Sequence, residues 1–281
     1  MENIKKPTYS EKELKTIARD LRMDILKATT KAGSGHLSSS FSSVEILTSL
    51  FFDGILRYKG DEPEWSDRDR FIMSKGHAAP LLYAVLAKAG YFSRDELWRL
   101  REAGSPVQGH PVLGNMPGVE ATTGSLGQGI SLGIGHVLGG RITKRKFSVY
   151  VLIGDGECQA GQIWESAMAA AHYKTDNLIA ILDYNKFQEM GPVSREMALE
   201  PLVEKWKSFG WHTAEVDGHN ILEITKTLKS LQTIKEKPSI LIAHTIKGKG
   251  VSFVEKDYTW HGRAIKDPEQ YKQAEKEILC S

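Results

Sequence analysis

The sequence has little cysteine and few marks of a secreted or membrane protein. Its two cysteines, Cys158 and Cys280, form neither a disulfide framework nor a metal-ligand pattern. No apolar run approaches the roughly 20 residues of a membrane span. Residues 1–8 are polar and lack the apolar core of a signal peptide. We therefore expect a soluble, cytoplasmic protein.

The sequence also lacks the charge patterns and motifs that bind several classes of ligand. The formal net charge is only +2, and no basic block is interleaved with aromatic residues, so neither nucleic acid nor a membrane is expected as a partner. The phosphate loop of nucleotide triphosphatases and the His-Glu-x-x-His motif of zinc enzymes are absent. The glycines between Gly133 and Gly139 follow no predicted strand, so we interpret them as sites of close helix packing rather than as a dinucleotide loop.

The chain is long enough for one large α/β domain or two small ones, with 281 residues of which 41% are hydrophobic. Short apolar runs predict strands at 70–73, 149–153, 178–182, 211–216 and 239–244. Helical periodicity predicts helices at 11–31, 44–52, 77–89, 126–138, 159–173 and 268–279. Ser10 followed by Glu13 has the form of a capping box. This alternation predicts an α/β fold, with a mainly parallel sheet and helices on both faces.

Polar residues follow two of the predicted strands. Gly154-Asp155-Gly156-Glu157 comes after the strand at 149–153, and Asp183-Tyr184-Asn185-Lys186-Phe187 comes after the strand at 178–182. A right-handed crossover places consecutive parallel strands in one sheet, and their carboxyl ends meet at the same edge. We therefore expect Asp155 and Asn185 to face a common point.

Such a point suits a magnesium ion that holds a diphosphate. Magnesium takes about six oxygens, of which only one or two usually come from protein side chains. Asp155, Asn185 and a backbone carbonyl near Phe187 would leave room for diphosphate oxygens and water. Gly156 would let the backbone approach the phosphates. Ordinary turn chemistry is the alternative for either segment alone, and the paired spacing favours the metal site.

Four of the nine histidines stand beside glycine or proline in predicted loops: His36, His77, His110 and His261. A single histidine in such a place is usually structural. Neutral imidazole can, however, donate a hydrogen bond to a phosphate or a sugar hydroxyl, and it shuttles protons near neutral pH. Four of them beside a candidate diphosphate site favour a functional interpretation.

Together these segments resemble the N-terminal, diphosphate-binding third of a transketolase. The resemblance runs from about Leu14 to Arg263. Its elements occur in the order of that family: 32–36, 74–78, 109–111, 122–129, the 154 and 183 segments, and 260–262. Each element alone is common, whereas the ordered series is specific. The resemblance implies that residues 1–281 form a single thiamine-diphosphate-binding domain of the PP type.

The resemblance also implies roles for individual residues. The metal ligands, to Mg²⁺ or alternatively Ca²⁺ or Mn²⁺, would be Asp155, Asn185 and the carbonyl of Phe187. The contacts to thiamine diphosphate would come from Ser39, His77, Gly124, Ser125, Leu126, Gly156, Asn185, Lys247 and His261. Sugar hydroxyls would be bound, and proton transfers assisted, by His36, His110 and His261. Ser38, Ser40 and Lys249 remain alternatives for Ser39 and Lys247.

A transketolase is similar to this chain followed by two further domains, which carry the pyrimidine-binding site and much of the sugar-phosphate site. The resemblance therefore implies the N-terminal subunit of a split transketolase. It would act with a C-terminal subunit that carries the pyrimidine-binding domain, in an α2β2 assembly. The implied reaction moves a two-carbon ketol group from a ketose phosphate to an aldose phosphate, as in the pentose phosphate pathway. The alternatives are a non-catalytic paralogue, the α subunit of a 2-oxo-acid dehydrogenase, or part of a deoxyxylulose-phosphate synthase.

One position departs from the pattern of the family. Ala160 stands where a glutamate of a carboxylate network between two active sites is usual, although Glu165, another expected member, is present. We hypothesise that communication between sites is weaker here, or that the partner supplies the carboxylate.

Overall fold

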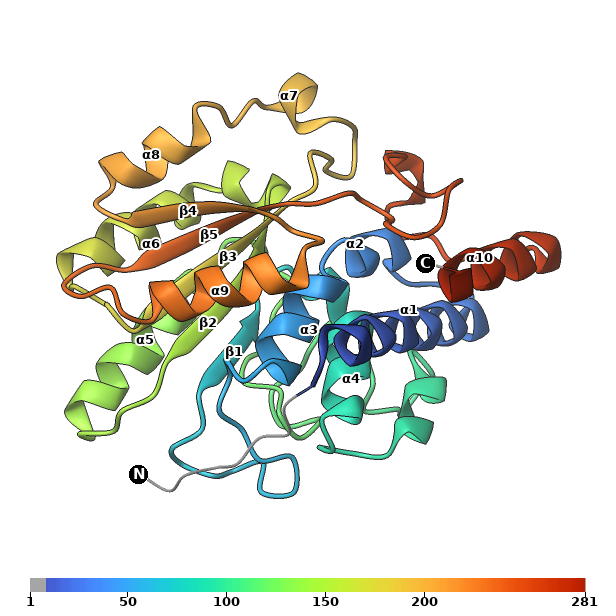
Figure 1. The fold of residues 1–281 in the computed structure, drawn as a ribbon, viewed down its shortest axis with the longest axis horizontal. Helices are drawn as coiled ribbons and strands as arrows, with labels where there is room; N and C mark the ends of the chain where they lie inside the picture. The colour runs from blue at the N-terminus through green and yellow to red at the C-terminus, as the bar shows by residue number, and fades with distance from the viewer. Residues whose placement is uncertain (1–8, 281) are drawn as a thin grey trace.

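The computed structural model describes residues 9–280, and at its centre lies a parallel sheet of five strands (Figure 1). The strands are β1 (Arg70–Met73), β2 (Val149–Gly154), β3 (Leu178–Tyr184), β4 (His212–Asp217) and β5 (Ser239–His244). Their order across the sheet is β1-β2-β3-β5-β4, and every neighbouring pair is parallel. The predicted fold class is confirmed.

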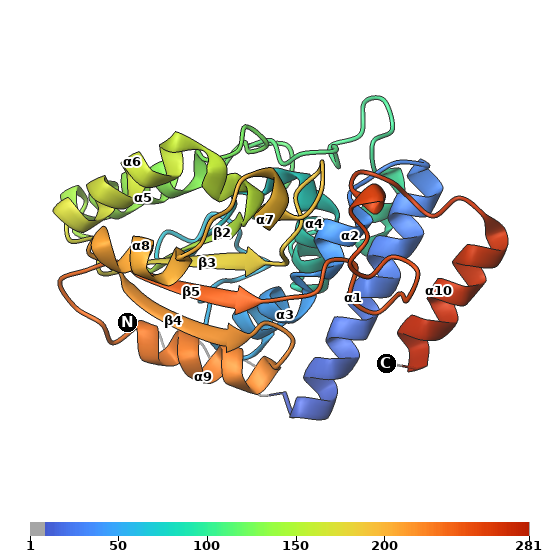
Figure 2. The ribbon, with the colours of Figure 1, turned by 90° about the horizontal axis from the view of Figure 1, so that it is seen from above.

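Helices cover both faces of this sheet, as seen from above in Figure 2. The long helices are α1 (Glu11–Ala32), α3 (Val44–Phe52), α4 (Ala79–Lys88), α5 (Gly129–Ile142), α6 (Gly161–His172), α9 (Ile221–Leu231) and α10 (Pro268–Cys280). Shorter helices are α2 (Leu37–Phe41), α7 (Val193–Glu196) and α8 (Leu202–Ser208), with 3₁₀ turns at Gly76–Ala78, Arg94–Arg99, Gly156–Gln159 and Tyr258–Trp260. No helix formed by residues 9–280 has both the length and the apolarity needed to cross a membrane.

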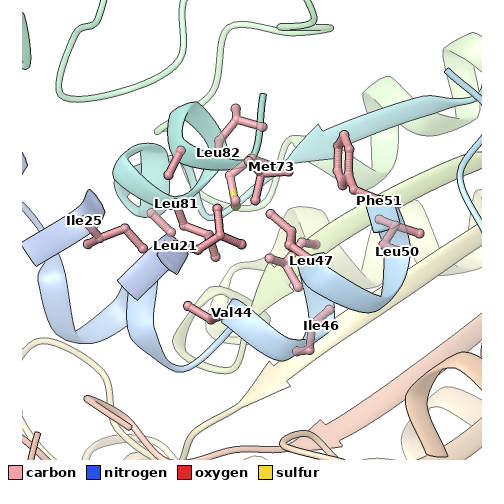
Figure 3. Close-up of a cluster of buried hydrophobic side chains, with 14 of the residues drawn as sticks. Leu21, Ile25, Val44, Ile46, Leu47, Leu50, Phe51, Met73, Leu81 and Leu82 are labelled. Atoms are coloured by element: carbon pink, nitrogen blue, oxygen red, sulfur yellow. The ribbon is translucent and has the colours of Figure 1, made fainter. Parts of the chain in front are cut away.

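Alternate residues of the central strands enter two separate cores. In β2, Tyr150 and Leu152 pack with α1, α3, α4 and α9, whereas Val149, Val151 and Ile153 pack with α5, α6 and α8. This follows from the period of two residues in a strand. Figure 3 shows part of the first core, where α1, α3 and α4 meet. Because both faces are covered, β2, β3 and β5 are apolar along most of their length, and polar chemistry is left to their ends, whereas the edge strand β4 is largely polar.

The ends of most elements agree with the sequence prediction within one or two residues. The capping box of α1 is present: the Glu13 N–H donates to Ser10 Oγ, and the Glu13 carboxylate accepts from the Ser10 N–H. The helix predicted at 126–138 was misplaced, because α5 of the structure begins at Gly129 and continues to Ile142. The reason is Gly127, whose φ of +96° forms a turn that no helix can include.

Candidate active site

A pocket of about 270 Å³ lies at the carboxyl ends of β2 and β3. The register pairs Gly154 with Asp183, so the polar residues that follow the two strands meet at one edge, as expected. The predicted site residues in its wall are His36, Ser39, His77, His110, Gly124, Leu126, Asp155, Gly156, Asn185, Phe187, Lys247 and His261. Ser125 is exposed and lies outside the pocket wall. Residues in the wall to which sequence reasoning gave no role are Lys75, Gly154, Glu157, Gln159, Gln188 and Glu189.

The candidate metal ligands are held by hydrogen bonds from the backbone. Asp155 accepts from the N–H of Gly156 at 2.7 Å and from the N–H of Lys186 at 2.5 Å. The side chain of Asn185 accepts from the Phe187 N–H at 3.1 Å and donates to Asp183 at 3.1 Å. These bonds orient both side chains before any ligand arrives, which is what a metal site requires.

The electrostatics of Asp155 fit a cation. Burial raises its pKa, and the nearby carboxylate of Asp183 raises it further, to about 7. A divalent ion beside this group would favour the charged form and offset the cost of burial. Within residues 9–280, no three histidine, cysteine, aspartate or glutamate side chains form a metal cluster. A cation would therefore rely on the mixed set of one carboxylate, one amide and one carbonyl.

Asp183 itself belongs to a buried ion pair that sequence reasoning missed. Lys75 donates to its Oδ2, which also accepts from Ser42 at 2.6 Å and Ser43 at 3.0 Å. Thr245 donates to the other oxygen. Burial opposes the charge of Asp183, but Lys75 and these donors lower its pKa to about 2. Asp183 thus stays ionised and holds Asn185 in place. Lys75 lies within the 74–78 segment that the sequence singled out. The ion pair was not predicted because Lys75 and Asp183 are far apart in the sequence.

Four histidines from four separate segments gather in the pocket. The ring centre of His36 lies 5.1 Å from those of His77 and His261 and 6.2 Å from that of His110. Burial lowers the pKa of each, to about 4 for His36 and about 3 for His261, with nearby positive charges acting in the same direction. All four imidazoles are therefore neutral near pH 7. The Nδ1 of His36 is buried and has no hydrogen-bond partner among residues 9–280.

Lys247 places a buried ammonium group in the same wall. Its Nζ lies 3.4 Å from Ser39 Oγ and 2.9 Å from His261 Nδ1. Because an ammonium can only donate, His261 Nδ1 accepts, and the imidazole proton lies on Nε2. Burial and the charge of Lys75 lower the pKa of Lys247 to about 8. Of the alternatives, Ser38 bonds to the Trp260 carbonyl, and neither Ser40 nor Lys249 lines the pocket.

Glu157 ties the glycine-rich segment at 122–129 to the end of β2. It is buried and accepts from the side chain of Ser74, from the Gly127 N–H at 2.8 Å and from the Gly154 N–H at 3.1 Å. Burial raises its pKa, while these donors act in the opposite direction. The segment also presses against Gly76, where an added Cβ would lie 2.7 Å from the backbone of Gly124. Gly124 and Leu126 are thereby fixed in the pocket wall.

The chain is similar to several known proteins. The family model described as transketolase, thiamine diphosphate binding domain, matches residues 10–278. One subunit of the apulose-4-phosphate transketolase of Phocaeicola vulgatus is 41% identical over 257 residues, which are 92% of this chain and 90% of that protein. The 6-deoxy-6-sulfo-D-fructose transketolase subunit SqwG of a Clostridium species is 40% identical, over 95% of this chain and 96% of that protein.

Longer relatives match over part of their length. Human transketolase is 41% identical over 94% of this chain, but this covers only 42% of the human protein. The crystal structure of transketolase from Campylobacter jejuni superposes with a TM-score of 0.90 at 29% identity, over 96% of this chain and 43% of that one. This chain therefore spans less than half of these single-chain relatives and nearly all of the two subunits.

The fold and the family match define a thiamine-diphosphate-binding domain. More narrowly, the chain belongs to the transketolase family, and its function is that of the thiamine-diphosphate-binding part of a transketolase. The resemblance found in the sequence is confirmed. The relatives of its own length are named as subunits, which indicates that a second subunit takes part.

Proposed function

We propose that this chain is the thiamine-diphosphate-binding subunit of a split transketolase, active only with a second chain that carries the pyrimidine-binding domain. The observation that carries the proposal is the pocket itself, which combines an oriented Asp155–Asn185 pair, a buried ammonium group and four neutral histidines. Relatives that are subunits of the same length support the split organisation. An α2β2 assembly is the arrangement we propose.

The metal centre would anchor the diphosphate. Asp155, Asn185 and the Phe187 carbonyl would supply three oxygen ligands, and Mg²⁺ would keep places for phosphate oxygens and water. Mn²⁺ or Ca²⁺ could use the same set. The Nε2 proton of His261 and the ammonium group of Lys247 would attract the remaining negative charge, and His77 and Ser39 line the same wall. These groups are buried, so their attraction for phosphate is screened less than at a surface.

The reaction we propose transfers a two-carbon ketol group from a ketose phosphate to an aldose phosphate. When bound, the thiazolium ring of the cofactor supplies the electron sink for carbon–carbon bond cleavage. The protein supplies position and proton transfer. His36 and His110 are neutral, so each can donate to one sugar hydroxyl and accept a proton from another. The contacts to the sugar phosphate would come in large part from the partner.

Reconstitution tests this proposal. The chain alone should bind thiamine diphosphate only when a divalent cation is present, and it should show no turnover of xylulose 5-phosphate with ribose 5-phosphate. Co-expression with a chain that carries the pyrimidine-binding domain should restore turnover. Asp155→Ala in the same complex should abolish it, and Asp61→Ala, which removes an exposed carboxylate outside the pocket, is the matched control. Full turnover without a partner would contradict the split organisation, and a chain that never binds the cofactor would indicate a non-catalytic paralogue.

A further inference from the structure

Three charged or titratable side chains outside the pocket form a compact cluster, in which Arg22 and Glu45 are buried and His219 is partly buried. Arg22 of α1 and Glu45 of α3 make a two-pronged ion pair, with N–O distances of 2.6 and 2.8 Å. His219, which follows β4, places its Nδ1 2.9 Å from Glu45 Oε2. None of these residues has a role predicted from the sequence, and none of them lines the pocket.

The cluster makes two bonds to the loop that carries Lys247. The N–H of Ile246 donates to His219 Nε2 at 2.8 Å. The Nε of Arg22 donates to the carbonyl of Lys249 at 3.0 Å. The first bond therefore holds Ile246, the residue before Lys247, and the second holds Lys249, two residues after it. The backbone on both sides of this lysine is fixed by side chains that do not belong to the pocket.

The two bonds of His219 depend on each other. Because its Nε2 accepts from a backbone N–H, the imidazole proton lies on Nδ1 and is donated to Glu45. Glu45 remains ionised, since burial opposes its charge but Arg22 and His219 lower its pKa to about 2. Arg22 thus fixes Glu45, Glu45 fixes the ring of His219, and the ring fixes Ile246.

The loop needs such support because of its composition. Gly248 and Gly250 flank Lys249 with φ values of +79° and +98°, and glycine gives a loop many alternative conformations. Lys247 carries a long side chain whose buried ammonium must reach Ser39 and His261 at 3.4 and 2.9 Å. A small change in the backbone would move that ammonium away from the pocket wall.

We propose that Arg22, Glu45 and His219 are positioning residues, which hold the loop so that the ammonium of Lys247 meets the diphosphate. This inference rests on the proposed function, because it gives Lys247 its ligand. The three residues touch neither cofactor nor substrate and act only through the backbone at Ile246 and Lys249.

Two variants of His219 separate its two bonds. His219→Gln keeps an acceptor near the position of Nε2, so it can still receive the Ile246 N–H. His219→Asn keeps a donor near the position of Nδ1 but is too short to reach Ile246. In the full chain without ligand, we expect amide exchange of the 245–251 segment to be about tenfold faster in the Asn variant and little changed in the Gln variant. Equal exchange in wild type and the Asn variant would overturn the inference.

Binding of thiamine diphosphate with Mg²⁺ gives the second measurement. The Asn variant should bind about five- to tenfold more weakly, as expected for the loss of one hydrogen bond. In a Lys247→Met background, His219→Asn should have no further effect, because the two residues act in series. If the two substitutions weaken the binding of thiamine diphosphate additively, His219 has a merely structural role. That result would overturn the inference and leave the proposed function intact. A wild-type chain that binds no thiamine diphosphate would overturn the proposed function and with it the role of Lys247.

Discussion

Lowering the pH should weaken metal binding, mainly through Asp155. In the metal-free chain its pKa is raised to about 7 from an ordinary value of 3.8. The pKa of Asp155 is higher in the folded chain than in the unfolded chain, so its protonation contributes to the stability of the fold. This contribution is fully present below about pH 4 and is lost as the pH rises through about 7. A divalent cation binds the ionised form, so it should stabilise the chain more at pH 8 than at pH 6.

The size of the effect follows from the ionised fraction. With a pKa of about 7, about one tenth of the Asp155 carboxyl groups are charged at pH 6 and about nine tenths at pH 8. The apparent affinity for Mg²⁺ or Mn²⁺ should therefore fall about tenfold between pH 8 and pH 6, or about 1.3 kcal/mol. Binding should release about 0.9 proton at pH 6 and about 0.1 proton at pH 8.

Isothermal titration with the metal alone, in buffers of different ionisation enthalpy, measures both quantities. Thiamine diphosphate is left out because its phosphates also titrate in this range. Asp155→Asn has nearly the same shape and no titrating carboxyl, so its weaker binding should depend much less on pH, with the ammonium group of Lys247, whose pKa is about 8, still titrating in this range. The reasoning would be refuted by an affinity that is equal at pH 6 and pH 8, or by metal binding at pH 6 without proton release.

Three further predictions concern other residues. Lys75→Met leaves the carboxylate of Asp183 buried without its partner and should destabilise the chain by about 3–5 kcal/mol in urea unfolding; a loss below about 1 kcal/mol would contradict the buried pair. Gly76→Ala should displace the 122–129 segment and weaken cofactor binding, because its Cβ would lie 2.7 Å from backbone atoms; Gly161→Ala, with no neighbour within 4 Å, is the control. Ala160→Glu in the assembled complex should change the cooperativity of thiamine diphosphate binding, and unchanged binding curves would count against a role for this position.

The sequence was sufficient to predict the sheet and the edge at which the site lies. Apolar runs indicated the strands. Polar residues follow two of these strands in the sequence, and their positions predicted that Asp155 and Asn185 lie close together. This worked because strand ends are local features, and the crossover rule then brings two of them together. Short helices such as α2 and α8 carry too few residues for a periodic signal, so they were missed.

Partners distant in the sequence could not be predicted. Asp183 and Glu157 stand inside segments that the sequence singled out, yet their roles depend on Lys75 and Gly127, which only the folded chain brings near. Ser125 shows the converse difficulty. Its place in a contiguous segment implies a contact with the cofactor, but Ser125 lies outside the pocket wall, and the contact stays a prediction. A motif predicts which segment reaches a site and not which of its side chains point inward.

The parallel register has a consequence for how this protein can change. The pocket lies at one edge of the sheet, and none of the residues in its wall lies in the segments that enter β2, β3 or β5 from the opposite edge, at 143–148, 173–177 and 232–238. Their exposed positions, at 143–146, 173–174 and 235–237, can be substituted with little effect on the chemistry, whereas Phe147 and Thr175 are buried and hold these connections to the core. Evolution and protein engineering can therefore work on one end of the molecule while the other end stays constant.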